Sequence, residues 1–256
     1  MSRVFITGAS SGIGAALARQ YAAQGASLGL LARRGAALEQ LRASLPHPER
    51  HTLYAVDVTD HAALAAAARD FIGAGGADVV IANAGISAGT LTEHAQDLAV
   101  FQDIFATNVS ATVATFAPFI ADMKRRGTPA RLVGIGSVAG IRGLPGAGAY
   151  SASKAAVLSY CESLRLELAS SCIKVVTIAP GYIDTPMTEK NSYPMPFLMP
   201  VARFAAVAAR TIASGSSYRV IPWQMGIVAK LLRALPNPLY DLAFSRAPHK
   251  ARKEAP

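Results

Sequence analysis

The chain has 256 residues, of which 52% are hydrophobic and only 16% are charged. This composition supplies a sizeable core and excludes an intrinsically disordered chain, and the length suits one α/β domain better than two small ones. The formal net charge is +9 at pH 7, and part of it comes from a basic tail over residues 246–256. Such a tail is either a solvated terminus or a contact for anionic lipid or nucleic acid.

Several features argue against a secreted, membrane-spanning or metal-binding protein. No run of about 18 apolar residues occurs, and the first residues lead directly into a strand-like run, which leaves no room for a signal peptide. Cys161 and Cys172 form no CxxC pair, and the five histidines are scattered through polar segments. We therefore expect reduced thiols, no metal site and a cytoplasmic globular protein.

Short apolar or β-branched runs alternate with alanine-rich stretches along the chain. We expect one domain, 1–256, as a doubly wound parallel sheet of about seven strands covered by helices on both faces. Ligands bind such a sheet at the carboxyl edge of the strands, where the strand order reverses. The expected strands are 3–7, 27–32, 51–58, 78–83, 130–137, 173–179 and 218–222, and the expected helices are 12–24, 36–45, 60–74, 96–125, 151–170 and 200–214.

Two segments depart from this alternation. Residues 186–200 are apolar and rich in proline, and we expect them to form a lid over the substrate. Residues 222–256 form a C-terminal extension that ends in the basic tail. Its apolar side chains could form a dimer contact, a pocket wall or an anchor at a membrane surface, and of these we favour packing in an oligomer. They are Trp223, Ile227, Leu231 and Leu235.

A glycine-rich octet, TGASSGIG, occupies residues 7–14, between the first expected strand and the first expected helix. Gly8, Gly12 and Gly14 allow a tight turn and a close approach to a pyrophosphate, whose charge then faces the free N–H groups of the helix. Glycines also occur in purely structural turns, but their position directly after a strand favours nucleotide binding.

The octet resembles the cofactor loop of the classical short-chain dehydrogenases/reductases, which are Rossmann-type three-layer αβα sandwiches. VDV at 56–58, ANAG at 82–85 and PGYIDTPM at 180–187 extend the resemblance, although Ala82 replaces the family's asparagine. The resemblance covers about residues 1–190. It implies a nicotinamide dinucleotide cofactor bound by Gly8, Ser10, Ser11, Gly12, Ile13, Gly14, Arg33, Arg34, Asp57, Val58, Asn83, Ala84, Gly85, Tyr150, Lys154, Pro180, Gly181, Ile183 and Thr185.

The resemblance also implies roles for some of these residues. Asp57 would hold the adenine amino group, Asn83 would stabilise the central sheet, and Gly85 would let the backbone pass the ribose. Pro180, Gly181, Ile183 and Thr185 would hold the nicotinamide carboxamide.

The end of the second expected strand addresses the choice between NAD and NADP. A carboxylate there would bind the ribose 2′-hydroxyl and repel a 2′-phosphate. This chain has Ala32 at about that position, followed by Arg33 and Arg34. Guanidinium groups bind phosphate through charge-assisted hydrogen bonds, so we expect NADP(H) in preference to NAD(H). The alternative is that both arginines are merely solvated.

Four polar residues resemble the family's catalytic tetrad. Tyr150 and Lys154 lie four residues apart, Ser137 ends a strand thirteen residues earlier, and Asn108 lies on the preceding helix. Tyr-x-x-x-Lys alone is common, and each residue singly could be a surface or capping group. Together they imply hydride transfer with Tyr150 as general acid/base, Ser137 orienting the substrate oxygen, and Asn108 holding a water in a proton relay from Lys154. We expect Lys154 to bind the nicotinamide ribose and, with the oxidised cofactor, to lower the pKa of Tyr150 by about one or two units.

The substrate is less well defined than the reaction. We expect a hydrophobic ketone, aldehyde or alcohol, because the expected pocket residues Ile86, Val138, Leu144, Tyr182 and Met187 are mostly apolar. Two other functions compete with an oxidoreductase. A non-catalytic NADP(H) sensor would not need the tetrad, and nucleic-acid binding is not expected because aromatic and basic residues do not interleave. We expect a homodimer or homotetramer, and a peripheral membrane contact through 222–256 is the less favoured alternative.

Overall fold

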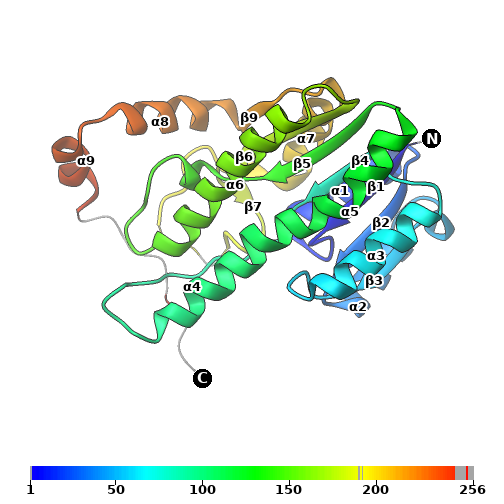
Figure 1. Ribbon diagram of the computed structural model, residues 1–256. Helices are drawn as coiled ribbons and strands as arrows, with labels where there is room; N and C mark the ends of the chain where they lie inside the picture. Colours follow the sequence, from blue (N-terminus) through cyan, green and yellow to red (C-terminus); the bar gives the residue numbers. More distant parts are fainter. Residues whose placement is uncertain (1, 190, 192, 246–251, 253–256) are drawn as a thin grey trace.

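A seven-stranded parallel sheet forms the centre of the protein (Figure 1). The computed structural model describes residues 2–189, 191, 193–245 and 252. The strand order is β3-β2-β1-β4-β5-β6-β9, so the order reverses between β1 and β4. The strands are β1 (Arg3–Thr7), β2 (Ser27–Ala32), β3 (Thr52–Ala55), β4 (Val79–Ala82), β5 (Ala130–Ile135), β6 (Ile173–Pro180) and β9 (Tyr218–Ile221).

Helices cover both faces of this sheet, which confirms the predicted Rossmann-type three-layer α/β fold. On one face α1 and α7 pack together, beside α2, and on the other α3 and α5 pack together, beside α6. The helices are α1 (Gly12–Ala23), α2 (Gly35–Ala43), α3 (His61–Gly73), α4 (Asp97–Phe105), α5 (Ala111–Arg126), α6 (Gly148–Glu167), α7 (Val201–Ser214), α8 (Trp223–Ala234) and α9 (Asn237–Phe244).

The composition of the central strands explains why they lie inside. All four residues of β4 are buried, and β5 is buried except for its partly exposed Arg131. Strands of a parallel sheet lie between two helical layers, so they are continuous apolar runs rather than alternating ones. The two faces of the sheet accordingly carry two large clusters of buried apolar side chains.

Some expected boundaries differ from the structure. The third strand is only Thr52–Ala55 rather than 51–58, because the chain leaves the sheet before Asp57. The expected helix 96–125 is interrupted by a π-helical turn, Ala106–Ser110, between α4 and α5. The lid segment contains the end of a short strand pair, β7 (Ile183–Asp184) with β8 (Met199–Pro200), which the sequence did not indicate.

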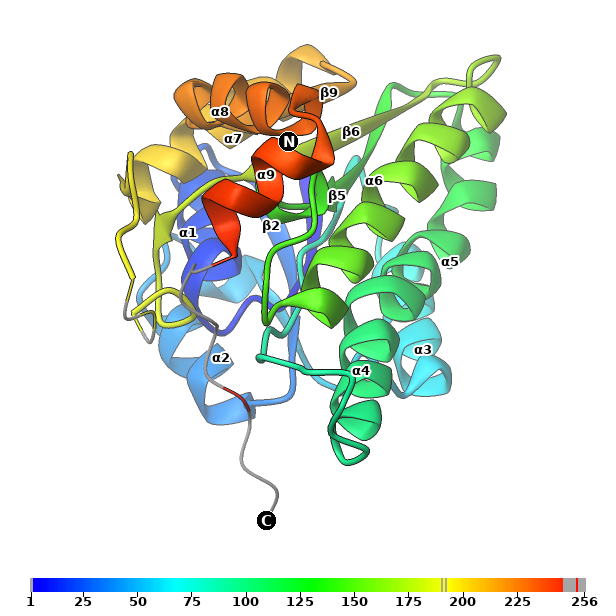
Figure 2. The same cartoon turned by 90° about the vertical axis from the view of Figure 1, so that its left-hand side faces the viewer.

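The C-terminal extension forms two helices, α8 and α9. Figures 1 and 2 show them on the outside of the molecule, near the loops that follow the strands. Of the predicted basic tail, only Arg252 lies within the described residues.

One continuous helical stretch, Asp97–Arg126, is long and apolar enough to cross a membrane by length and composition alone. Its buried residues Phe116, Phe119 and Met123 belong to the core cluster shared with α3 and the sheet. We therefore regard this stretch as a core helix of the domain.

Candidate functional site

Thr7 and Asn83 join β1 to β4 at the point where the strand order reverses. The Thr7 hydroxyl accepts hydrogen bonds from the backbone N–H groups of Asn83 and Ala84, at 3.1 and 3.2 Å. In return, the Asn83 side-chain amide donates to the Thr7 carbonyl at 2.9 Å. These bonds fix the two loops that leave the sheet here, one running into α1 and the other toward α4.

Glycines allow these loops to approach closely. Gly8 has φ +66°, and a Cβ there would lie 2.8 Å from the Ala84 Cα. A Cβ on Gly14 would lie 2.3 Å from the Gly8 carbonyl oxygen. Both separations are shorter than side-chain contacts permit, so the turn between β1 and α1 depends on glycine at these positions.

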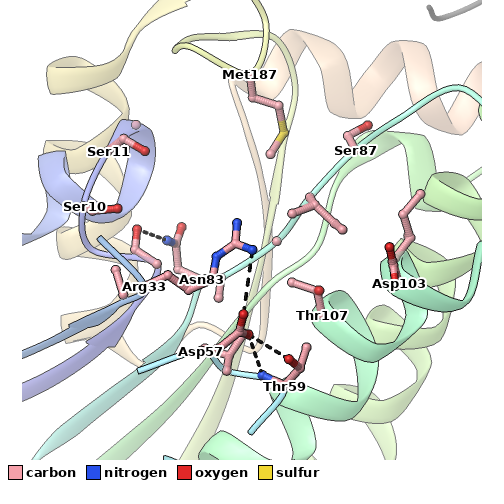
Figure 3. Close-up of a pocket in the computed structure, with 18 of the residues that line it drawn as sticks. Ser10, Ser11, Arg33, Asp57, Thr59, Asn83, Ser87, Asp103, Thr107 and Met187 are labelled. Atoms are coloured by element: carbon pink, nitrogen blue, oxygen red, sulfur yellow. Dashed lines mark hydrogen bonds and ion pairs between the residues drawn. The ribbon is translucent and has the colours of Figure 1, made fainter. Parts of the chain in front are cut away.

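A cavity of about 700 Å³ lies along this edge of the sheet (Figure 3). Its walls come from the loops after β1, β2, β3 and β4, together with α4, the π-helical turn and the start of the lid. Of the predicted cofactor residues, those lining it are Gly8, Ser10, Ser11, Gly12, Ile13, Arg33, Arg34, Asp57, Val58, Asn83, Ala84, Gly85 and Thr185.

The two arginines after β2 have different partners. Arg34 donates hydrogen bonds to the hydroxyls of Ser10 and Ser11, at 3.1 and 2.9 Å. Arg33 points toward Asp57, and its guanidinium lies 3.7 Å from the carboxylate (Figure 3). The other Asp57 oxygen accepts from the backbone and hydroxyl of Thr59, and the Thr59 bonds, with Arg33 beside them, lower the pKa of Asp57. This end of the cavity is therefore polar and carries two guanidinium groups.

Tyr150, Lys154 and Ser137 meet where α6 passes the end of β5. The Ser137 hydroxyl is hydrogen-bonded to the Tyr150 phenol. The Lys154 ammonium donates to the Ile135 carbonyl at 2.9 Å and lies 5.9 Å from the centre of the Tyr150 ring. The spacing of four residues on α6 thus turns both side chains toward the edge of the sheet.

Burial dominates the proton equilibria of this pair. It raises the pKa of Tyr150, an effect that the hydrogen bond from Ser137 opposes. It also lowers the pKa of Lys154 from 10.5 to about 8. With the oxidised cofactor bound, we expect the Lys154 ammonium to lower the pKa of Tyr150. In the chain as described the shift has the opposite sign, because desolvation penalises the phenolate.

Asn108 lies in the π-helical turn and is 1% exposed. Its side-chain oxygen accepts from the backbone N–H of Ile86 at 2.8 Å, and its amide donates to the Ile86 carbonyl and to the Ser153 hydroxyl. Single π-helical turns occur often at functional sites because they redirect one side chain out of the helical ladder. Here the turn directs Asn108 at the loop after β4.

Gly85 links the cavity to two of the four predicted catalytic residues. A Cβ there would lie 3.2 Å from the Asn108 side-chain oxygen and 3.5 Å from the Lys154 ammonium. Asn108 and Lys154 are therefore immediate neighbours of the cavity wall, although neither they nor Ser137 and Tyr150 belong to the residues that line it.

Some predicted residues lie elsewhere. Gly14 is packed behind the glycine turn, and Gly181 is packed against Met225 of α8. Ile183 is 2% exposed and belongs to the core cluster, so its side chain does not face the cavity. Pro180, at the end of β6, also does not line it.

The predicted substrate residues divide into two groups. Ile86 and Met187 line the cavity. Val138 and Leu144 lie on the loop between β5 and α6, and Tyr182 packs edge-on against Tyr193, with ring centres 6.3 Å apart. The described lid residues thus contribute aromatic and aliphatic side chains near the site.

Sequence reasoning did not single out Thr7, Thr59 or Ser153, and it considered Arg142 only as a basic residue of the pocket wall, yet each of the four holds another element in place. Arg142, on the loop between β5 and α6, donates hydrogen bonds to the carbonyls of Leu232 and Leu235 at the end of α8. Ser153 had a signal, since it lies between Tyr150 and Lys154 on a helix expected to carry the site, and Thr7 is the first residue of the glycine-rich octet. No group of three or more metal-ligating side chains occurs among the described residues.

Comparisons with known proteins agree with this architecture. The sequence pattern of the short chain dehydrogenase family matches residues 2–195. An uncharacterised oxidoreductase of Myxococcus xanthus (strain DK1622) is 35% identical over 249 residues, which cover 94% of this chain and 95% of the relative.

Two solved structures have the same arrangement of elements. The 3-ketoacyl-(acyl-carrier-protein) reductase from Brucella melitensis, complexed with NADH, has a TM-score of 0.76 and 25% identity, covering 86% of this chain and 96% of the other. The structure of ElxO with NADP bound gives the same TM-score, identity and coverage. Since the family pattern spans most of the chain, this protein belongs to the short-chain dehydrogenase family of oxidoreductases.

Proposed function

We propose that the protein interconverts a ketone or aldehyde and the corresponding alcohol, with NADP(H) as the hydride donor or acceptor. The observation that carries this proposal is that Ser137, Tyr150 and Lys154 lie together, with the Lys154 ammonium next to Gly85 in the wall of a cavity of about 700 Å³. Related structures hold NADH or NADP, which supports a nicotinamide cofactor.

The cavity fits such a cofactor. The glycine turn and the first N–H groups of α1 suit a pyrophosphate, and the close packing of Gly8 against Ala84 keeps side chains out of this part of the loop. Arg34 with the Ser10 and Ser11 hydroxyls offers donors for a 2′-phosphate at the adenosine end. Arg33 adds positive charge there, although part of it is offset by Asp57.

The cofactor supplies or accepts the hydride, and the protein must handle the proton. Tyr150, whose pKa is raised by burial, stays protonated at neutral pH and donates its proton to the carbonyl oxygen during reduction. The Ser137 hydroxyl donates a hydrogen bond to the same oxygen and orients it. The Lys154 ammonium favours the phenolate that Tyr150 leaves behind, and Asn108 fixes the loop after β4.

The apolar residues of the lid and of the loop after β4 support a hydrophobic substrate. A homodimer or homotetramer and a cytoplasmic location, both predicted from the sequence, form part of the same proposal. The competing function is an NADP(H) sensor that binds the cofactor without turnover.

Oxidation of NADPH in the presence of a panel of steroid, acyl, sugar and quinone carbonyls separates the two functions. We expect turnover with the apolar ketones and a loss of at least about a hundredfold in kcat for Tyr150→Phe, which cannot donate the proton. Tyr160→Phe, on the same helix but packed against Phe116, is the matched control. Full activity of Tyr150→Phe would refute the mechanism, and tight NADPH binding without turnover of any carbonyl would favour the sensor.

The choice of cofactor has its own test. Arg34→Ala should weaken NADPH binding about ten- to a hundredfold, because a hydrogen bond to a charged group contributes about 1.5–3 kcal/mol. NADH binding should change little. Equal affinity of the unaltered protein for NADH and NADPH would contradict the role given to Arg34.

A further inference from the structure

Helix α8 carries an exposed apolar stripe that faces away from the domain. Trp223, Ile227 and Leu231 are 64%, 52% and 63% exposed. They follow one another at intervals of four residues, so they lie along one side of the helix. The opposite side is buried through Met225 and Ala229. Figure 1 shows α8 along the outer surface of the molecule.

A groove of about 520 Å³ continues this surface beyond Trp223. It runs between the end of the lid, α7 and β9. Two lid residues on its wall, Phe197 and Leu198, are 50% and 45% exposed. Phe197 has φ +59°, a backbone conformation that is uncommon for an aromatic residue. The lid therefore holds two large apolar side chains in solvent beside the tryptophan.

The same groove is strongly basic. Arg203, Arg210 and Arg219 line it, and none of the described residues that line it is acidic. All three arginines are exposed, and within the described part of the chain none of them forms an ion pair. This arrangement of unneutralised guanidinium groups beside exposed apolar side chains suits a partner that is both anionic and apolar.

The positive charges on this face help to decide between two possible partners, a second copy of the chain and a phospholipid surface. Besides the groove arginines, Lys230 is exposed on the same side of α8 as the stripe, and the helix contains no acidic residue. In a two-fold contact the same patch lies on both partners, so these cations would be brought together and desolvated without counterions. At a bilayer surface lysine and arginine can instead extend to the phosphates while their apolar neighbours enter the interface.

We propose that this face, formed by the stripe on α8, the end of the lid and the three groove arginines, docks on an anionic phospholipid bilayer. Trp223, Ile227 and Leu231 enter the interface, and Arg203, Arg210 and Arg219 contact the lipid phosphates. The net charge of +9 adds a long-range attraction to such a surface. The sequence alone favoured packing in an oligomer for α8, whereas its exposed cations favour the membrane. This inference does not depend on the proposed reaction.

The chain offers a local probe for this contact, because Trp223 is its only tryptophan. We expect vesicles of phosphatidylglycerol and phosphatidylcholine to shift the Trp223 emission to shorter wavelength and to sediment the protein. Vesicles of phosphatidylcholine alone should bind at least about tenfold more weakly, and 1 M salt should weaken binding because the Debye length falls to about 3 Å.

Single substitutions separate the contribution of the arginines to membrane binding from that of the apolar stripe. Arg203→Gln should lower the partition coefficient about fivefold, since each basic residue near such a surface contributes about 1 kcal/mol. Ile227→Gln should lower it about tenfold through lost apolar burial. The matched control is Leu166→Gln, which changes a leucine that is 63% exposed on α6 and should bind normally.

Three results would overturn the proposal. These are a Trp223 emission that does not respond to anionic vesicles, binding that Ile227→Gln and Leu166→Gln weaken equally, or an emission shift that depends on protein concentration without vesicles. The last result, accompanied by a dimer in light scattering that Ile227→Gln dissociates, would assign the face to a second copy of the chain.

Discussion

Lys154 is a buried cation whose presence costs stability. It is 5% exposed, and burial lowers its pKa from 10.5 to about 8. Because the folded pKa is the lower one, the unfolded chain binds the proton more tightly between these two values. The penalty is fully present below the folded pKa and disappears above the unfolded one.

Lys154→Met should therefore raise the free energy of unfolding near neutral pH, by up to about 3 kcal/mol, while abolishing activity. The gain should shrink as the pH rises from about 8 toward 10.5. Urea denaturation at several pH values measures it. Lys174→Met, at an exposed position of β6, is the control and should change little at any pH. A loss of stability for Lys154→Met near neutral pH would contradict the prediction.

Replacing each of two buried serines on α6 by alanine should have different effects on the stability of the protein. The Ser153 hydroxyl donates to the Tyr150 carbonyl and accepts from the Asn108 amide, at 2.8 and 2.9 Å. The Ser151 hydroxyl is also buried but has no hydrogen-bond partner within the described part of the chain. Ser153 is therefore a positioning residue for Asn108, whereas Ser151 carries an unsatisfied polar group.

Ser153→Ala should destabilise the protein by about 1–3 kcal/mol, because it leaves the buried Asn108 amide short of an acceptor, and it should lower kcat more than it changes KM. Ser151→Ala should be neutral or stabilising and should leave kcat unchanged. Chemical denaturation and steady-state kinetics on both variants compare these effects. Equal behaviour of the two variants would show that the Asn108 contact has no special importance.

At the scale of secondary-structure elements, Arg142 attaches the C-terminal extension to the loop between β5 and α6. It donates hydrogen bonds to carbonyls at the end of α8 and stacks on Tyr240 of α9, 3.9 Å from the ring centre. Tyr240 in turn donates to the Gly143 carbonyl at 2.5 Å. The last carbonyls of a helix lack intrahelical donors, so a guanidinium there acts as a cap.

Arg142→Met should release α8 and α9 from this loop without unfolding the sheet. We expect faster hydrogen exchange in α9, and a larger rise in KM than fall in kcat, because the loop carries the predicted pocket residues Val138 and Leu144. Arg165→Met, at an exposed position of α6, serves as the control. Unchanged exchange in α9 would show that the extension is held by its apolar contacts alone.

The sequence predicted best the elements in which consecutive residues have the same surroundings, such as fully buried strands. Strands 3–7 and 27–32 have the predicted boundaries because buried parallel strands are continuous apolar runs. The π-helical turn around Asn108 has no periodic signal, since its extra residue is set by the contact with Ile86. The β7–β8 pair consists of two residues on each strand, too few for any pattern.

The site shows the same division. The glycine turn and the polar residues after each strand could be predicted, because their positions follow from strand ends and from the family resemblance. The contacts that hold them, such as Thr7 with Asn83 and Arg142 with α8, join residues that are far apart in the chain. Sequence alone gives no spacing for such pairs.

At the scale of the whole molecule, Arg252 contacts the loop after β4, at the edge of the site. Arg252 donates two hydrogen bonds to Asp97, both at 2.9 Å, and pairs with Gly89 in an isolated bridge. Asp97 is 4% exposed and also accepts from the backbone N–H of Leu91 at 2.7 Å. On its other side, the loop after β4 is held by Thr90, whose N–H donates to Gly146. Arg252 and Gly146 thus hold this loop from two sides.

Because Arg252 and the Leu91 N–H stabilise the carboxylate, the pKa of Asp97 is lowered. A lowered folded pKa means that the contact contributes stability above the unfolded pKa and loses it as the pH falls through the folded one. Hydrogen exchange at the Leu91 amide, corrected for its intrinsic rate, should therefore accelerate under acid conditions. Asp97→Asn and Arg252→Gln should produce the same acceleration at neutral pH, with Glu162→Gln, at an exposed position of α6, as the control. If Leu91 stays protected in both variants, the loop is held by Thr90 and Gly146 alone and Arg252 does not clamp the site.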